Sequence, residues 1–250
     1  MIGAYLRRGV VAGLLAGLLA GAVGLFTGEP GVDAAVAREE ALAAAQPAPA
    51  GTGMATRGDQ FVITRDTQKV GLVAGTVLVG IAVGALFAVV AAWAVGRVGG
   101  DAWARSLKLG AALVGAIVVL PALKYPPNPP AVGDPATIDD RTTAYVGVVV
   151  IGLVLAALGW AVARRLAGGR LPAPARQAMV GAGLVLLATL LLLGLPAAEA
   201  APAGFPADLL WRFRLSSVAT QLSLVGGVAV AFGLLAARAE RRDHVRAAAT

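Results

Sequence analysis

Long apolar stretches separated by short polar segments run along the whole chain. Six of them approach or exceed the length of about 20 residues that a helix needs to cross a bilayer. They cover residues 9–26, 70–95, 107–123, 144–163, 178–198 and 215–237. None contains an acidic residue, and the one charge inside them, Lys108, lies next to a span end, where it can reach the headgroups. Because backbone groups in lipid must be satisfied internally, we predict an all-α integral membrane protein with six transmembrane helices.

The first stretch also has features of a secretory signal. Arg7 and Arg8 precede an apolar run, as in a signal peptide, although no A-x-A cleavage site directly follows Phe26. Glycines recur at every fourth position of this run as overlapping G-x-x-x-G motifs, which let a second helix approach closely. We therefore expect a retained span, able to pack within the chain or in a homo-oligomer. Its packing strip consists of Gly9, Gly13, Gly17 and Gly21.

Composition argues against most soluble chemistry. The chain of 250 residues is 58% hydrophobic and 14% charged, whereas soluble domains are about 45–50% apolar and about 25% charged. It has no cysteine and a single histidine, His244, which excludes metal sites built from thiolates or from several imidazoles. The motifs G-x-S-x-G and H-E-x-x-H and a P-loop are absent. We therefore predict that the protein is not an enzyme and has no tightly bound cofactor.

The net charge of +7 is unevenly distributed between the two sets of connecting segments. Six spans put both termini on one side, where the segments hold 13 Lys or Arg and three Asp or Glu; the opposite segments hold 8 and 11. These charges of +10 and −3 place both termini in the cytoplasm (N-in/C-in) by the positive-inside rule. The basic excess thus sets the orientation, and we expect no nucleic-acid partner.

The predicted extracytoplasmic loops are longer than the cytoplasmic ones. Residues 27–69 form the first, with a start that can become a short surface helix and a low-complexity middle that we expect to be flexible. Five prolines between 126 and 135 enforce an extended path in the third, and the fifth, 199–214, is also Pro-containing. Residues 238–250 form a basic cytoplasmic tail.

Oxygen ligands concentrate on the extracytoplasmic side. Carboxylate and amide oxygens suit hard or borderline divalent cations, so we expect some of these groups to form a cation-attracting mouth. Solvation of loop charges, or pairing of each acid with a nearby arginine, is the alternative. The candidates are Glu29, Asp33, Glu39, Glu40, Asn128, Asp134 and Asp208.

Within the spans, one polar stripe remains at the start of the sixth. Ser217, Thr220 and Gln221 share a helix face there, and they can line an ion path or make interhelical hydrogen bonds. The tripeptide Leu-Pro-Ala ends the third span and recurs at the end of the fifth, each time followed by a Pro-containing loop, an Asp and an Arg. We predict that these two loops form an outer gate joined by Asp–Arg pairs. The gate residues are Tyr125, Arg141, Arg212 and Arg214.

Three loop motifs resemble a known family. They are KYPPNPPAVGDP at 124–135, GFPADLLWRFRLSS at 204–217 and the acidic start of the first loop at 28–40. They are similar to signatures of the CbtA-type predicted cobalt transporter subunits. The resemblance implies a subunit of the bacterial inner membrane that takes up cobalt for cobalamin, with Co²⁺ as the transported ion. It also implies a small single-span, His-containing partner of the CbtB type.

We therefore expect a permease-like membrane subunit in which outer acids concentrate the cation, the two loops gate its entry and a polar seam near Gln221 conducts it. Because this chain has a single histidine, on the cytoplasmic side, we expect the partner to supply imidazole ligands. The alternative is a membrane scaffold that assembles a separate metal carrier, which the lack of acids inside the spans favours.

Overall fold

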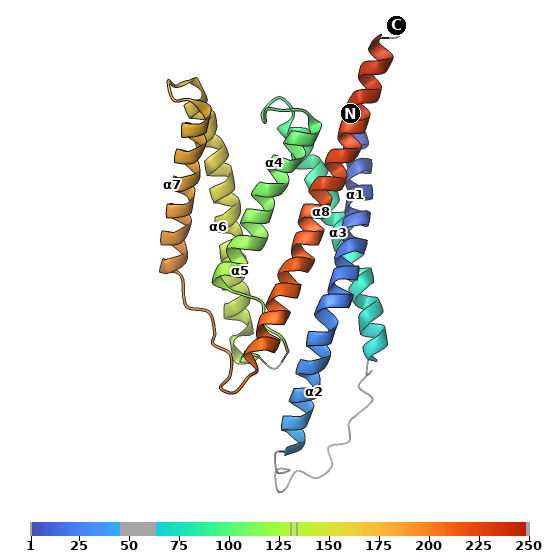
Figure 1. Ribbon diagram of the computed structural model, residues 1–250, viewed down its shortest axis with the longest axis vertical. Coiled ribbons are helices and arrows are strands. Elements are labelled where there is room, and N and C mark those ends of the chain that lie inside the picture. The colour runs from blue at the N-terminus through green and yellow to red at the C-terminus, as the bar shows by residue number, and fades with distance from the viewer. Residues whose placement is uncertain (1, 46–63, 131, 134, 249–250) are drawn as a thin grey trace.

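The computed structural model describes residues 2–45, 64–130, 132–133 and 135–248, and within them every regular element is helical. This part of the chain contains six helical segments that are long and apolar enough to cross a membrane, which confirms the all-α, six-span prediction. Both chain termini lie toward the same end of the bundle (Figure 1). We call it the terminal end. The loop end is the opposite one, where segments 124–137 and 195–206 connect helices.

The first two helices form one continuous rod. α1 (Ile2–Val23) passes through a π-helical turn, η1 (Gly24–Gly28), into α2 (Glu29–Ala45), and the rod extends beyond the rest of the loop end (Figure 1). The first part of the predicted loop 27–69 is therefore helical, because its alanine-rich sequence has high helix propensity. It continues the first span instead of forming a separate surface helix. The low-complexity middle of that loop lies outside the described residues.

The glycine strip of α1 packs against α3 (Arg65–Ala94). A Cβ atom at Gly9 would lie 2.2 Å from the carbonyl oxygen of Gly84, and one at Gly13 would lie 2.1 Å from that of Gly80. The two backbones are thus in direct contact, and no side chain fits between them. Gly17 and Gly21 continue the strip against Thr76. The strip is buried within the chain, so a second copy can reach it only if α1 and α3 separate.

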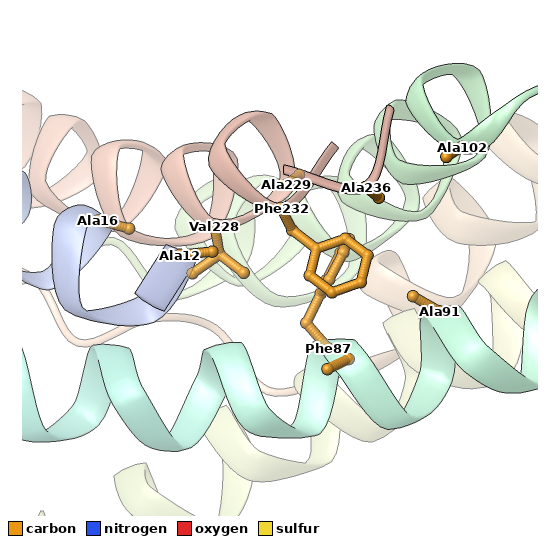
Figure 2. Packing of buried hydrophobic residues seen from close by; sticks show 10 residues of the cluster. Ala12, Ala16, Phe87, Ala91, Ala102, Val228, Ala229, Phe232 and Ala236 are labelled. Atoms are coloured by element: carbon orange, nitrogen blue, oxygen red, sulfur yellow. The ribbon is translucent and has the colours of Figure 1, made fainter. Parts of the chain in front are cut away.

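The longest helix, α8 (Ala207–Ala248), packs against α1, α3 and α4. Its Phe232 ring lies 5.3 Å from the ring of Phe87 on α3 in an edge-to-face arrangement. Figure 2 shows Phe232 close to Phe87, and the small residue Ala12 of α1 beside Val228 of α8. Apolar side chains therefore fill the space between these helices in the terminal half of the bundle.

The third span is interrupted by a π-helical turn. It consists of α4 (Ala102–Val114), η2 (Gly115–Val119) and α5 (Leu120–Lys124). The proline at 121 has no N–H group and its ring crowds the carbonyl four residues earlier, so a wider turn before it relieves the conflict. The helix continues past Pro121 to Lys124, one residue beyond the predicted end of this span.

A helical hairpin forms the other side of the bundle (Figure 1). After the short 3₁₀ turn η3 (Pro135–Thr137), α6 (Ile138–Arg165) runs to the terminal end, and a second 3₁₀ turn, η4 (Leu166–Gly168), leads toward α7 (Ala173–Gly194).

Two contacts join this hairpin to the other helices. A Cβ atom at Gly152 of α6 would lie 2.3 Å from the carbonyl oxygen of Ala116 in η2. At the terminal end, the rings of Trp93 and Trp160 are 5.4 Å apart. α7 packs against α6 and has no buried residue, so it is the most peripheral of the spans.

Several predicted boundaries were wrong. The fifth span was predicted to end at 198, but α7 ends at Gly194, because Pro196 forces the preceding Leu195 into an extended conformation (ψ 154°). The predicted tail 238–250 continues α8 as helix to Ala248. All six helical segments begin five to eight residues before the predicted spans, because each of them starts with residues that include charged side chains.

Candidate functional site

A large hollow lies at the loop end, between the third loop, the fifth loop and the start of α6. Its volume is about 1080 Å³. Residues 125–128, 137–147 and 195–199 supply most of its walls, and Gln221 of α8 reaches it from the polar stripe. The two loops predicted to form a gate thus enclose one cavity.

Backbone carbonyls of the fifth loop tie it to the third. The Lys124 ammonium donates to the carbonyl oxygen of Leu195 at 2.9 Å, and the Tyr125 hydroxyl donates to that of Pro196 at 3.0 Å. These two donors follow the first Leu-Pro-Ala tripeptide after one intervening leucine, and their acceptors belong to the second tripeptide. The weak internal repeat in the sequence therefore corresponds to two segments that lie side by side.

Arg141 and Glu199 make the ion pair between the two loops. The Arg141 Nη1 and Glu199 Oε2 atoms are 3.5 Å apart, and the Thr137 hydroxyl donates to the same carboxylate oxygen at 3.3 Å. Gly133 bends toward this pair with a φ of 112°, and a Cβ atom there would collide with the guanidinium. The two loops were expected to be joined by Asp–Arg pairs, and the acid that the structure pairs with Arg141 is a glutamate of the fifth loop.

A second contact joins α8 to the third loop. Arg214 Nη2 donates to the Asn128 side-chain oxygen at 2.9 Å. The amide oxygen predicted as a cation ligand therefore accepts a hydrogen bond from a guanidinium. Asp208 and Arg212 are both exposed, and neither makes an ion pair within the described residues. Asp134 lies outside the residues that the structure describes.

The polar stripe of α8 is divided between two neighbours. Gln221 lines the cavity. Thr220 instead lies beside Gly24 of η1, and its hydroxyl donates to the carbonyl oxygen of Ser216 on its own helix at 2.9 Å. Ser217 is half-buried. The stripe therefore presents the amide of Gln221 to the cavity, while the Thr220 hydroxyl is hydrogen-bonded to a backbone carbonyl of its own helix.

The acids of the first loop form a separate cluster between α2 and α3. Arg65 bonds both Glu29 and Asp33 at 2.6 Å, and Lys69 lies 3.2 Å from the other Asp33 oxygen. Glu39 and Glu40 are exposed further along α2. The described residues contain no group of three His, Cys, Asp or Glu side chains placed to hold a metal ion. Among the described candidate acids, Glu29 and Asp33 are thus paired with basic side chains of α3.

The oxygen ligands predicted on the extracytoplasmic side also include Asp140 and Glu199, which were left out of the candidate set and which the structure places at the cavity. Glu199 bonds Thr137 and Arg141, and Asp140 lines the wall on the first turn of α6. A usable signal was present, because Glu199 is the first charged residue after the second Leu-Pro-Ala tripeptide, as Lys124 is after the first. Matching the repeats by position would have brought Glu199 into the candidate set.

The chain was compared with known proteins. A protein-family model described as "Probable cobalt transporter subunit (CbtA)" matches residues 2–237, nearly the whole chain. No curated protein and no solved structure matches it.

Proposed function

Because the chain belongs to the CbtA family of probable cobalt transporter subunits, we propose that it is the permease-like membrane subunit of a cobalt uptake system that serves cobalamin synthesis. Co²⁺ is the cargo and not a resident cofactor. We place the subunit in the inner membrane of a bacterium, with both termini in the cytoplasm and the cavity open to the outside. It works with a small single-span membrane subunit of the CbtB type, whose contribution the uptake experiment below measures.

The cavity at the loop end is the single observation that carries this proposal. It brings carboxylates, a guanidinium and the amide of Gln221 together at one hollow. A pure scaffold has no need for a hollow of this size enclosed by two cross-linked loops. The cargo enters between the loops and meets Gln221 at the start of the sixth span.

The other end of the proposed route is closed. Phe87, Phe232 and Val228 fill the space between α1, α3 and α8, and all three are buried. Passage therefore requires a second arrangement of the helices, in which the cavity closes at the loop end and opens at the terminal end. The peripheral hairpin of α6 and α7 is the part that can move with the least loss of packing.

The membrane potential can supply the energy, since the chain contains no nucleotide-binding motif. A charge gains about 2.3 kcal/mol for each 100 mV it crosses, so a divalent cation gains about 4.6 kcal/mol. Uptake by this route depends on the potential and stops when an uncoupler removes it.

The alternative is a membrane scaffold that assembles a separate metal carrier. It is favoured by the absence of any described group of three acidic or His side chains placed for a metal ion. A scaffold would leave uptake intact when the cavity is altered, provided that the protein is still inserted.

Radiolabelled cobalt uptake separates the two functions. Cells that express the chain, with and without a small single-span partner, are expected to accumulate ⁵⁷Co above cells that carry an empty vector. Asp134→Asn and Asp208→Asn are expected to weaken this uptake, because each removes a charge that attracts the cation. Uptake at the level of the vector control in both strains would reject the transport function.

A further inference from the structure

The cavity at the loop end is far larger than a hydrated metal ion. Six waters at about 30 Å³ each occupy about 180 Å³, and the cavity measures about 1080 Å³. Pockets that bind small organic molecules are about 300–1,000 Å³ in volume. Its size is thus that of a site for an organic ligand.

The chemistry of the walls agrees with this size. Prolines, alanines and the tyrosines at 125 and 145 supply much of the lining, with polar groups at a few separate places. Such a surface covers carbon-rich molecules well, because it buries their apolar area while a few hydrogen bonds set their orientation. A hydrated ion has no apolar surface to bury and gains nothing from these walls.

The charges of the walls do not form a shell for a bare dication. Asp140 and Glu199 are the carboxylates on the wall, and Glu199 is paired with Arg141. The amide oxygen of Asn128 accepts from Arg214. In the described part of the chain no three acidic or His side chains converge on one point. The ligands that coordinate the metal must therefore be bound to it when it enters the cavity.

We infer that the cavity receives its metal as a complex with a small organic chelator, and not as the hydrated ion. The inference rests on the proposed function and names the form of its cargo. The chelator supplies the inner ligands, the aromatic and proline walls cover its carbon atoms, and the one unpaired wall carboxylate favours a complex that is neutral or carries a single positive charge. A chelator thus replaces the imidazoles expected from the partner.

The test uses the full chain, purified alone in detergent, and two cobalt probes. One is ⁵⁷Co²⁺ in water; the other is the exchange-inert bis(L-histidinato)cobalt(III) cation, which cannot hand its metal to the protein. Equilibrium dialysis is expected to give a Kd about tenfold lower for the complex. A Kd for the aqueous ion equal to or lower than that of the complex would overturn the inference.

A matched pair of variants locates the binding. Gly147 lines the cavity, and a Cβ atom there meets nothing within 4 Å, so Gly147→Leu adds volume without a clash. Gly181 on α7 also has open space around it and does not line the cavity, which makes Gly181→Leu the control. The first variant is expected to weaken binding of the complex about tenfold and the second to leave it unchanged. Equal affinities in the two variants would count against this cavity as the site.

The uptake experiment keeps the two proposals distinguishable. Cells that accumulate ⁵⁷Co through a chain that does not bind the complex would refute the chelate and leave the transport function intact. Failure of uptake under every condition would remove the transport function itself.

Discussion

At the scale of single residues, Glu199 is one of the groups that join the third and fifth loops. Its carboxylate accepts from Thr137 and pairs with Arg141, which in turn lies against the bend at Gly133. The side chains of Arg141 and Glu199 are 38% and 31% exposed, so solvent screens part of their attraction. Glu199 is therefore a positioning residue that keeps the third and fifth loops together.

We expect Glu199→Gln to lower cobalt uptake about tenfold, because an amide of the same shape no longer attracts the guanidinium that spans the two loops. Asp208→Asn is the matched control, since Asp208 is an exposed acid of the same segment that makes no ion pair in the described residues. Its effect is expected to be smaller. Uptake is measured at equal amounts of membrane-inserted protein, and equal losses in the two variants would contradict the role assigned to Glu199.

At the scale of elements, the contact between α1 and α3 depends on the absence of side chains. Gly13 and Gly80 bring the two backbones so close that a methyl group cannot be placed between them. Alternating small residues along both helices extend this contact over several turns. The close contact increases van der Waals attraction between the helices and costs no side-chain entropy. Such packing drives helix association in lipid, where the hydrophobic effect does not favour contact between helices.

Gly13→Ala is therefore expected to destabilise the bundle by about 1–3 kcal/mol, because the added methyl group forces the two backbones apart. Gly71→Ala is the control on α3, where a Cβ atom meets nothing within 4 Å. It is expected to be neutral or to stabilise by about 0.5–1 kcal/mol, since alanine is the better helix former. Reversible unfolding in mixed detergent micelles measures both, and equal stabilities would show that the strip does not hold the two helices together.

At the scale of the whole molecule, basic and acidic residues concentrate at opposite ends of the bundle. The terminal end carries an ion pair between Arg105 and Glu240 and a row of further arginines on α8. The loop end carries the acids of the first loop and of the cavity. The long rod of α1 and α2 and the long α8 extend past the bundle at opposite ends, so the molecule presents an acidic and a basic protrusion.

The absence of cysteine makes this orientation directly testable. Ala198→Cys places a thiol in the exposed fifth loop, and Ala248→Cys places one at the exposed end of α8. In intact cells or right-side-out vesicles, a membrane-impermeant maleimide is expected to label the first variant and not the second. Both should react after permeabilisation. Labelling of Ala248→Cys alone in intact cells would show that the protein has the opposite orientation in the membrane.

The sequence by itself determined the elements and the membrane character. A span of apolar residues must satisfy its backbone internally, so each stretch becomes a helix whatever its neighbours do. The spacing of Gly9 and Gly13 also indicated a close helix contact, since the repeat places them on one face. These features depend on residues within a few turns of one another, which is why they can be read locally.

Only the tertiary structure decided which groups meet. Arg141 and Glu199 are far apart in the chain, and their pairing depends on how the hairpin of α6 and α7 returns to the loop end. Helix packing likewise decides the ion pairs of Arg65 with Glu29 and Asp33, two of the predicted metal ligands. Hydrophobicity is a local property that fixes each helix, whereas the position of a charge relative to another depends on helix packing. The cavity is a product of that packing.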